Sequence, residues 1–274
     1  EIPEGAKNSK GRAIQNMLNI DADDKVNAFI RVKQLQDPEY NMSHNLLFCT
    51  RKGVIKKTKL EAYSRPRQNG VNAITIREDD QVIQVRLTTG DSQIIMANKH
   101  GRAIRFHEST VREMGRTATG VRGMTLDETG DDEVIGMICI KDPEKETVMV
   151  VSEQGYGKRS EIEDYRITNR GGKGVKTLNI TEKTGNLVAI KSVTDENDLV
   201  IINKSGITLR MKVADVRIMG RATQGVRLIN LEKRNDEIAS VCKVLSETES
   251  DSSNSENIDS ASEINEAEAS ETTE

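Results

Sequence analysis

The sequence predicts an all-β fold, a propeller-like array of repeated blades. Three observations support this prediction. A pattern of about 50 residues recurs four times along the 274-residue chain. Each repeat contains short runs rich in Val and Ile, such as Val54–Lys57 and Val82–Leu87, separated by turn-forming Gly, Asn and Asp. The chain has no tryptophan, which argues against repeats of the WD40 type.

The first repeated motif is [Thr/Asn/Ser]-x-x-Gly-x-x-x-[Lys/Arg]. Its glycines, Gly53, Gly101, Gly155 and Gly206, are 48, 54 and 51 residues apart. Glycine adopts the backbone angles of a tight turn at no steric cost, so we expect a strand, a Gly turn and a second strand. The residue four positions after each glycine is basic, and these residues are Lys57, Arg105, Arg159 and Arg210.

A second motif follows each first one and places a glycine directly before a valine. These glycines are Gly70, Gly120, Gly174 and Gly225. The segments 114–122 and 219–227 are the best internal match. In three copies an arginine lies four residues before the glycine, and these arginines are Arg116, Arg170 and Arg221. The remaining copy, before Gly70, has Arg65 and Arg67 instead.

The register divides the chain into four complete units, at about 29–81, 82–133, 134–186 and 187–237. Residues 1–28 resemble the end of an earlier, truncated blade, and 238–245 resemble the first strand of another. We therefore expect one domain over 1–245, with a blade split between its two ends. The chain begins at Glu1 without a methionine, so we expect it to be part of a longer protein.

Charge is segregated along the chain. Ten acidic residues and no Lys or Arg lie between Glu247 and Glu274, so the formal charge of −4 hides a body of about +6. A basic body suggests a polyanion-binding surface. The tail, predicted to be disordered over 246–274, is able to compete for that surface; a purely solubilising role is the alternative.

Catalytic and metal-binding patterns are missing from the sequence. The three cysteines, Cys49, Cys139 and Cys242, lie far apart in apolar runs, as expected for reduced, buried thiols. Histidines make no ligand spacing with them, and we expect no metal, no cofactor and no catalytic residue in this chain. No apolar run reaches the ~18 residues of a membrane span, so no membrane partner is expected.

Phased cations point to duplex DNA instead. In a radial array, equivalent cations recur at intervals around the edge of a disc, and backbone phosphates dominate affinity for DNA. Aromatic residues make up 3% of the chain, which argues against a surface that stacks single-stranded bases. The predicted contacts are Lys56, Lys57, Arg65, Arg67, Arg102, Arg105, Arg116, Arg122, Lys158, Arg159, Arg170, Lys173, Arg210, Arg221 and Arg227.

The richest copy of the second motif reads Thr168-Asn169-Arg170-Gly171-Gly172-Lys173-Gly174. Cations beside glycine-rich backbone make a seat for a phosphate. For any single cation, protection of a sheet edge against aggregation is the alternative role.

The chain resembles a known family, the C-terminal domain of the DNA gyrase A subunit. The resemblance extends from Glu1 to about Leu245. It rests on specific runs, which are Gly11–Ile14 with Asn16–Leu18, Arg105–Glu108 through Met114–Arg116, Gly120–Gly123, Gly155–Arg159, and Gly220–Arg221 with Gln224–Val226.

The resemblance implies a six-bladed β-pinwheel whose basic rim wraps duplex DNA. With ATP and Mg²⁺ used by other parts of an A2B2 holoenzyme, wrapping would drive negative supercoiling in the bacterial cytoplasm. The catalytic tyrosine belongs to a domain that this chain lacks, so the chain alone is not expected to be an enzyme. The family's signature heptapeptide, Gln-Arg-Arg-Gly-Gly-Lys-Gly, belongs to its first blade, whereas the similar segment 168–174 lies in a later blade. The alternatives are the corresponding domain of topoisomerase IV and a protein-binding propeller.

Overall fold

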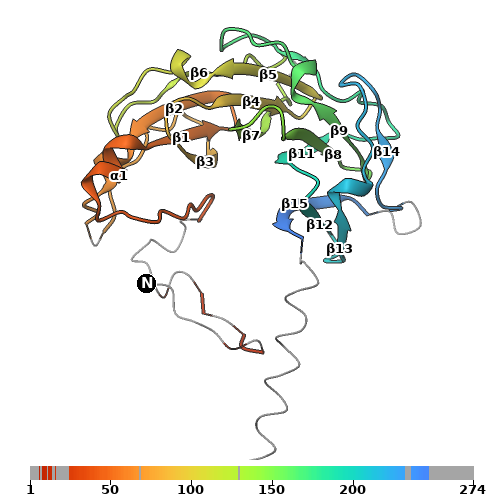
Figure 1. Ribbon diagram of the computed structural model, residues 1–274, viewed down its shortest axis with the longest axis horizontal. Helices are drawn as coiled ribbons and strands as arrows, with labels where there is room; N and C mark the ends of the chain where they lie inside the picture. The colour runs from red at the N-terminus through yellow and green to blue at the C-terminus, as the bar shows by residue number, and fades with distance from the viewer. Residues whose placement is uncertain are drawn as a thin grey trace, which may run out of the picture.

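The computed structural model confirms the all-β prediction (Figure 1). The structure describes residues 6, 8–10, 12–13, 16, 25–67, 69–128, 130–231 and 236–246. Four antiparallel sheets follow one another along an arc, like consecutive blades of a propeller. A short helix, α1 (Pro38–Ser43), precedes the first sheet, and the Asp37 side chain caps its N-terminus.

Each sheet consists of short strands joined by tight turns. In order across the sheets, the first contains β3 (Val82–Thr88), β1 (Asn45–Thr50), β2 (Val54–Lys59) and β6 (Val121–Arg122). The second contains β7 (Val134–Ile140), β4 (Gln93–Asn98), β5 (Arg102–His107) and β10 (Val175–Lys176). The third contains β11 (Leu187–Val193), β8 (Thr147–Ser152), β9 (Tyr156–Glu161) and β14 (Val226–Arg227). The fourth contains β15 (Ile238–Leu245), β12 (Asn197–Asn203) and β13 (Thr208–Lys212).

Short 3-10 helices follow the third strand of each sheet. They are η2 (Leu60–Tyr63), η3 (Glu108–Thr110), η4 (Ile162–Asp164) and η5 (Val213–Asp215). Because each of these helices comes directly after its strand, the chain leaves every sheet in the same way before entering the second motif. The repeat seen in the sequence is therefore also a repeat in the structure.

Consecutive repeats exchange strands. In the first sheet, β1 and β2 pair with β3 and β6, which both lie in the next repeat along the chain. The strands β3, β7, β11 and β15 lie toward the inner, concave side of the arc, whereas β6 and β14 lie on its outer side (Figure 1). The two-residue outer strands β6, β10 and β14 are the Val-Arg and Val-Lys pairs that follow the second-motif glycines. This motif therefore supplies an outer edge strand to the preceding blade.

The first motif is a capped β-turn. Its glycines adopt positive φ, for example +82° at Gly53 and +76° at Gly101. The first residue of the motif accepts a hydrogen bond from the backbone that follows the turn: Asn98 Oδ1 accepts from Arg102 N at 2.7 Å. Thr50 Oγ1 accepts in the same way from Val54 N at 3.1 Å. Ser152 instead donates from Oγ to Tyr156 O at 3.2 Å across its turn. The Thr, Asn or Ser at this position therefore closes the turn with its side chain.

The hydrophobic core lies between neighbouring sheets. Leu47 and Ile55 of the first sheet pack with Ile94 and Met96 of the second, and all four are fully buried. A second cluster joins sheets two and three, and a third cluster, which includes Leu199, joins sheets three and four. Full burial of each such side chain contributes about 1.5–3 kcal/mol. The blades are therefore held face to face by apolar contact.

Buried cations reinforce these contacts. Arg105 is 3% exposed, and its Nη1 donates to the carbonyl oxygens of Ile162 at 2.8 Å and Tyr165 at 2.9 Å in the next repeat. Arg159 occupies the same place in the following repeat, and its Nη1 donates to Val213 O at 3.2 Å. Ile162 and Val213 each begin a 3-10 helix, and their carbonyl oxygens also accept from Tyr165 N at 3.0 Å and from Val216 N at 2.9 Å. The guanidinium group therefore gives each of these two carbonyls a second donor.

In the first and last repeats, the basic residue four positions after the turn glycine makes different contacts. Lys57 Nζ donates to Glu108 O in η3, but at 3.4 Å. Arg210 lies in the last described sheet and pairs with Asp198 Oδ2 at 2.8 Å within its own sheet. The basic residue after each turn glycine therefore joins one repeat to the next wherever a following 3-10 helix is present. We refer to Lys57, Arg105 and Arg159 as the inter-repeat cations.

Two buried lysines hold the loops that lead to the outer strands. Lys56 Nζ donates to Ala73 O at 2.6 Å and also to Arg116 O, and it lies 5.6 Å from the centroid of the Phe48 ring. Lys158 Nζ donates to Gly220 O at 2.6 Å. Burial lowers the pKa of each lysine from 10.5 to about 8. Both side chains are fully buried and used within the fold.

The number of blades differs from the prediction. The resemblance implied six, and the described residues form four sheets, which correspond in number to the four complete repeats. The run from Gly11 to Ile20, predicted to end an earlier blade, and the acidic tail after Ser246 fall almost entirely outside the described residues. The pinwheel-like arrangement with exchanged strands holds for the four sheets.

Replacing an inter-repeat cation should destabilise the fold strongly. Arg105→Met or Arg159→Met removes the hydrogen bonds that a charged group donates to carbonyl oxygens of the next repeat, together with the ion pair to Glu163 or Asp195. We therefore expect each variant to lose about 2–4 kcal/mol of unfolding free energy. Urea denaturation followed by circular dichroism measures this loss.

Arg210→Met is the matched control, because Arg210 occupies the same motif position but has a 40% exposed side chain and pairs with Asp198 of its own sheet. A surface pair is worth about 0–1 kcal/mol. Equal losses in all three variants would contradict the inter-repeat role.

Candidate nucleic-acid interface

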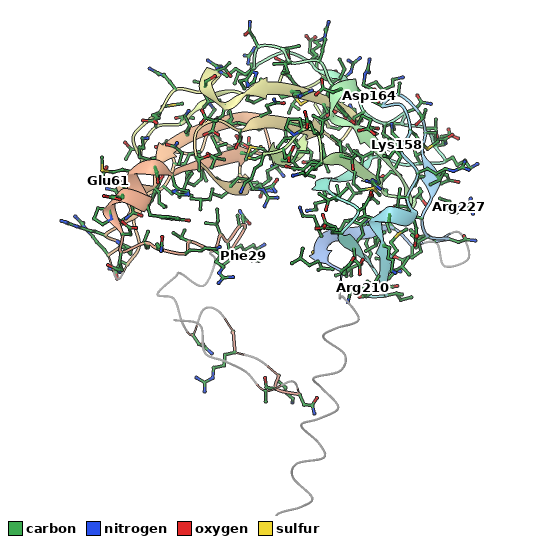
Figure 2. The ribbon with its side chains drawn as sticks, in the orientation of Figure 1. Phe29, Glu61, Lys158, Asp164, Arg210 and Arg227 are labelled. Carbon is green, nitrogen blue, oxygen red and sulfur yellow. The ribbon has the colours of Figure 1, made fainter. Side chains whose placement is uncertain are left out.

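The fifteen predicted DNA contacts separate by burial. Five have buried side chains that bond inside the fold, which gives them a structural role in place of the predicted phosphate contact. These five are Lys56, Lys57, Arg105, Lys158 and Arg159. Figure 2 shows Lys158 within the body of the protein and Arg227 on its outer side. At these five positions, the period of the basic residues follows from the contacts that hold the blades and their loops together.

The other ten are accessible to solvent to different degrees. Six are exposed, namely Arg65, Arg67, Arg122, Lys173, Arg210 and Arg227. Four are half-buried, namely Arg102, Arg116, Arg170 and Arg221. Except for Arg102 and Arg210, which lie on β5 and β13, these residues belong to the second motif. The accessible part of the predicted set is therefore concentrated in that motif.

The second-motif loops run along the outer side of the sheets. Each loop begins after a 3-10 helix and then crosses the preceding blade. There, one residue of the loop forms an isolated parallel β-bridge with a strand of that blade. The bridges are Glu113 with Lys57, Ile167 with Arg105, and Ile218 with Arg159. The loop then ends in the outer strand, β6, β10 or β14. Because three loops repeat this path, their side chains recur at corresponding places on three successive blades. We refer to segments 112–122, 166–176 and 217–227 together as the rim.

The backbone of the rim is fixed tightly to the blades. A Cβ atom at Gly174 would lie 2.4 Å from Ala103 O, and one at Gly120 would lie 2.7 Å from Ile55 O. Both glycines also have positive φ, +74° and +106°. Only glycine fits so close an approach of two backbones. The Gly-Val pair of the motif is therefore explained by its contact with the neighbouring blade.

Half-buried arginines position the rim loops. Arg170 donates from Nη1 to Arg122 O at 3.0 Å and from Nε to Thr110 O at 3.1 Å. Arg221 donates from Nη1 to Lys176 O at 2.9 Å. The Nη1 bonds of both arginines join a loop to the outer strand supplied by the previous loop. The arginine four residues before the glycine thus links neighbouring parts of the rim.

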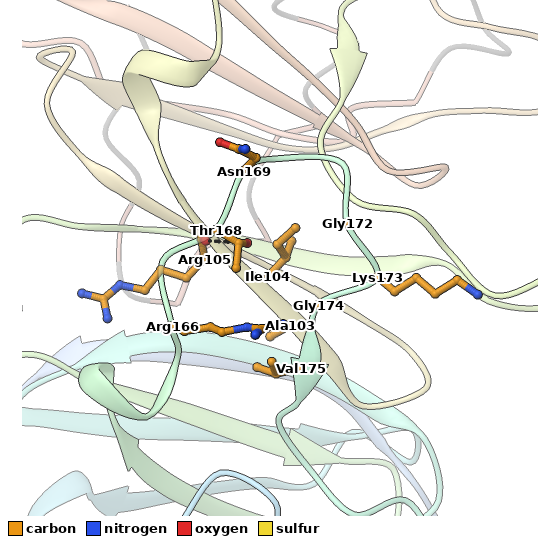
Figure 3. A pocket seen from close by; sticks show the side chains of 10 residues that line it. All are labelled: Ala103, Ile104, Arg105, Arg166, Thr168, Asn169, Gly172, Lys173, Gly174 and Val175. Carbon is orange, nitrogen blue, oxygen red and sulfur yellow. Dashed lines mark hydrogen bonds between the residues drawn. The ribbon is translucent and has the colours of Figure 1, made fainter.

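The glycine-rich segment 168–174 forms the side of a cavity of about 280 Å³ (Figure 3). Gly171 has φ +87°, its N–H donates to Gly123 O at 2.7 Å, and its carbonyl accepts from Thr125 Oγ1 at 2.6 Å. Asn169 and Lys173 are exposed, and Lys173 extends away from the loop (Figure 3). The segment is thus one rim loop among three, with an exposed lysine before its glycine that the other two loops lack.

Sequence reasoning missed four exposed cations of the rim. Arg112, Arg166 and Arg217 each follow the residue that closes a 3-10 helix and occupy the same position in three repeats. Lys176 is the exposed end of β10, where β6 and β14 carry Arg122 and Arg227. The signal was present in the sequence, since Arg112, Arg166 and Arg217 each come directly after a Val or Tyr. These three arginines lie just outside the motif that was defined.

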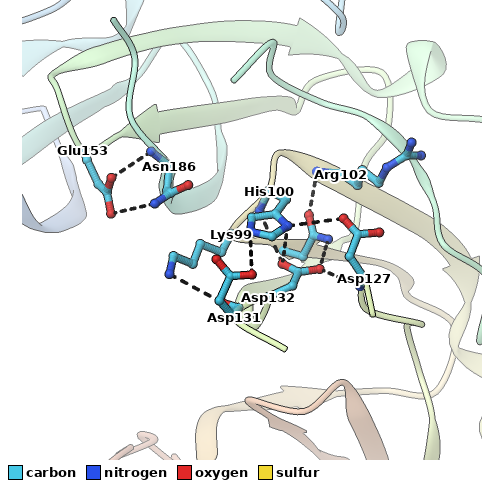
Figure 4. Close-up of polar contacts among 9 residues, drawn as sticks. Lys99, His100, Arg102, Asp127, Asp131, Asp132, Glu153 and Asn186 are labelled. Carbon is cyan, nitrogen blue, oxygen red and sulfur yellow. Dashed lines mark hydrogen bonds and ion pairs between the residues drawn. The ribbon is translucent and has the colours of Figure 1, made fainter. Parts of the chain in front are cut away.

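A histidine and two aspartates meet at the second turn (Figure 4). Nδ1 of His100 lies 3.3 Å from Asp127 Oδ2 and 3.8 Å from Asp132 Oδ1, and the three groups offer ligand atoms within 4.8 Å of one another. Such a set could hold a metal ion, which the sequence did not indicate. Asp80 and Asp236 occupy the position of Asp132 in other repeats and bond their turns without a histidine. In these three repeats the aspartate therefore fixes the turn.

The cysteine prediction holds in part. Cys49 is buried and Cys139 is half-buried, but Cys242 is exposed, contrary to expectation. Cys242 lies on β15, an edge strand of the fourth sheet, on which only Ile238 and Val241 are buried. Among the described residues, no helix is long and apolar enough to cross a membrane.

Comparison with known proteins agrees with the fold and the motifs. A family model described as "DNA gyrase C-terminal domain, beta-propeller" matches residues 1–33, 44–89, 92–141, 146–194 and 197–242. The DNA gyrase A subunit of Staphylococcus aureus (strain NCTC 8325 / PS 47) is 44% identical over 256 residues, which is 93% of this chain and 28% of the relative. Its counterpart from strain MRSA252 is 46% identical over 231 residues, 84% of this chain and 25% of the relative. The chain thus spans little more than a quarter of these relatives.

Two solved structures are also similar. A crystal structure of the C-terminal domain of DNA topoisomerase IV has a TM-score of 0.77 at 26% sequence identity. The match covers 86% of this chain and 71% of the topoisomerase IV chain. A structure of a DNA gyrase A C-terminal domain has a TM-score of 0.75 at 25% sequence identity. The match covers 86% of this chain and 76% of the gyrase chain. The matched repeats, the strand-exchanged blades and the identity to gyrase A proteins together place this chain in the DNA gyrase C-terminal domain family of β-propellers.

Proposed function

We propose that this chain binds duplex DNA along the rim and wraps it around the outer side of the arc. The observation that carries this proposal is the recurrence of exposed cations at corresponding positions of three rim loops. Those positions hold Arg112, Arg166 and Arg217 at the start of the loops and Arg122, Lys176 and Arg227 at their ends. A single line of phosphates can meet such a series only if the DNA follows the curve of the blades.

Duplex DNA suits this surface better than single strands do. Phosphate contacts need cations but few base-reading groups, and the rim offers arginine and lysine with little aromatic surface. Bending a duplex of 20–30 base pairs by 40–90° costs on the order of 1–6 kcal/mol, so several contacts must act together to offset it. Three loops on a rigid scaffold supply such a set without rearranging on binding.

The rim is built from elements that fix its cations in place. Arg170 and Arg221 tie each loop to the preceding outer strand, and the buried lysines Lys56 and Lys158 anchor the second-motif segments from below. A preorganised surface loses little conformational entropy when a ligand binds. This rigidity supports binding in which the protein shapes the DNA.

Within a larger enzyme, wrapping would present a DNA segment for passage through a break made elsewhere. The gyrase A relatives continue well beyond the matched region, and we propose that the breaking domain, the gyrase B protein, ATP and Mg²⁺ belong to the rest of an A2B2 holoenzyme in the bacterial cytoplasm. This chain then contributes DNA geometry, and the holoenzyme introduces negative supercoils. By itself the chain would have no strand-passage activity.

A role in topoisomerase IV is the second candidate, because the TM-score of 0.77 to that enzyme's C-terminal domain exceeds the 0.75 to the gyrase domain. Sequence identity of 44% and 46% to gyrase A proteins favours gyrase. The two roles differ in whether DNA is wrapped, so a measurement of the linking number of circular DNA can distinguish them.

Binding to a 40-base-pair duplex should weaken steeply as salt rises, because each phosphate contact releases a counterion. Replacing Arg166, Lys173 and Arg217 together by Gln should lower the slope of log K against log salt by about 3, since each phosphate contact contributes about one. Fluorescence anisotropy at several salt concentrations measures the slope. Lys204→Gln, which removes a cation paired with Glu237, should leave the slope unchanged. A slope that is the same in the parent chain and both variants would rule out the rim as the DNA surface.

Wrapping should also change DNA topology. Nicked circular DNA ligated in the presence of the chain, and then freed of protein, should carry a positive linking difference that grows with protein concentration. Gel electrophoresis with an intercalator resolves the sign. Tight binding without a linking difference would favour the topoisomerase IV role, and absence of duplex binding would favour a protein-binding propeller.

Removing residues 247–274 should tighten duplex binding. The ten carboxylates of this segment compete with phosphates for the rim, so we expect an affinity gain of several-fold at low salt that disappears at high salt. Anisotropy titrations of the full chain and of the chain ending at Ser246 test this. Equal affinities at every salt concentration would leave the tail with a solubilising role.

A further inference from the structure

A cation-lined cavity lies on the side of the arc opposite to the rim. Its volume is about 760 Å³, and its walls include Arg86, Lys141, Lys191 and Lys243. These residues lie on or directly after β3, β7, β11 and β15, the strands on the inner side of the arc (Figure 1). Each of the four sheets therefore contributes one cation to the same cavity. Binding pockets for small molecules typically have volumes of about 300–1,000 Å³.

These four cations are not neutralised by partners in the fold. Among the described residues, none of their side chains makes a hydrogen bond or an ion pair. The other cation of the cavity, Lys145, is different, because it pairs with Asp142 at 3.2 Å. The half-buried rim arginines and the buried lysines differ too, because they bond to carbonyl oxygens.

The carboxylates of the cavity are engaged elsewhere. Glu146 accepts hydrogen bonds from the backbone N–H groups of Lys141 and Asp142, both at 2.9 Å, and from Ser192 Oγ. Asp142 holds Lys145 and the N–H of Glu144. Five cations against two carboxylates leave the cavity with a formal charge of +3. An anion that entered would find donors without having to displace an existing partner.

The cations also crowd one another. Burial lowers the pKa of Lys191 below 10.5, and the nearby charge of Arg86 lowers it further. Burial lowers the pKa of Lys243 too; Glu146 opposes this shift, while Arg86 and Lys141 add to it. Arg86 and Lys191 are half-buried, whereas Lys141 and Lys243 are exposed. Like charges that line one cavity repel each other, and a bound anion relieves that repulsion.

We propose that this cavity is a binding site for a small multivalent phosphate anion, held by one cation from each of the four blades. Three lysines supply ammonium donors, and the planar Arg86 guanidinium can bind two phosphate oxygens at once. The chemistry is shared by inorganic polyphosphate and by the triphosphate of a nucleotide. Phe29, which is 93% exposed, also lines the cavity and offers a flat apolar ring on which a nucleotide base could stack.

Such an anion would join the blades at the inner side of the arc, where the inter-repeat cations do not reach. The site is separate from the rim, so anion binding and duplex binding depend on different side chains. A ligand that binds the folded state alone raises stability in proportion to the logarithm of its concentration over its Kd. The anion would therefore act on the shape and stability of the array.

Titration of the full chain with sodium tripolyphosphate tests the site. Isothermal titration calorimetry should show one tripolyphosphate bound per chain, and the thermal unfolding midpoint should rise as the anion is added. Lys191→Met and Lys243→Met keep the apolar stem and remove the charge, and each should weaken binding by at least about tenfold. ATP without Mg²⁺ is the second probe. Tighter binding of ATP than of tripolyphosphate identifies a nucleotide as the ligand, and equal or weaker binding identifies the phosphate chain.

Lys173→Met is the matched control, since it removes one exposed charge from the rim, and it should bind tripolyphosphate as the parent chain does. Without anion, Lys191→Met should unfold at a temperature no lower than the parent chain, because removing a crowded charge relieves repulsion. The chain ending at Ser246 repeats the titration without the tail carboxylates. Absence of one-to-one binding in both chains, or equal loss in Lys173→Met and Lys243→Met, would overturn the proposal. Lys191→Met should bind duplex DNA as tightly as the parent chain does, because Lys191 lies outside the rim.

Discussion

A hydrogen bond from a buried cation to the carbonyl oxygens of the next 3-10 helix joins each repeat to its neighbour, and the shape of the array follows from it. Arg105 and Arg159 each leave their own strand and reach the following repeat. A solenoid or propeller repeat cannot bury its hydrophobic face alone, so the angle between neighbours must be fixed by contacts between them. Apolar clusters supply the attraction, and the directional bonds of the guanidinium groups fix the geometry.

Strand exchange extends this constraint to the rim. Each outer strand belongs to the repeat that follows its blade, so a rim loop must start at one blade and end on the previous one. The glycines at these ends allow two backbones to approach at distances that no Cβ would permit. The cations of the rim are therefore placed by the same contacts that join the blades, and their spacing follows the spacing of the sheets.

The two sides of the arc use cations in different ways. On the outer side, half-buried arginines bond to carbonyl oxygens and hold loops that also expose further cations. On the inner side, Arg86, Lys191 and Lys243 line one cavity without such partners. Because charge in a partly desolvated cavity is costly unless it is compensated, the cations on the inner side favour the small anion proposed there. The cations on the outer side recur along the rim and suit the extended duplex proposed there.

Local sequence patterns were enough to predict the all-β class and the glycine turns between strands. These features are local, because glycine at positive φ and alternating Val and Ile act within a few residues. The same patterns could not separate buried from exposed cations: Arg105 and Arg210 stand at the same motif position, yet one is inside the fold and the other at its surface. That difference, the exposure of Cys242 and the meeting of four cations at the inner side emerge only when the blades are packed, because each depends on which blade lies next to the residue.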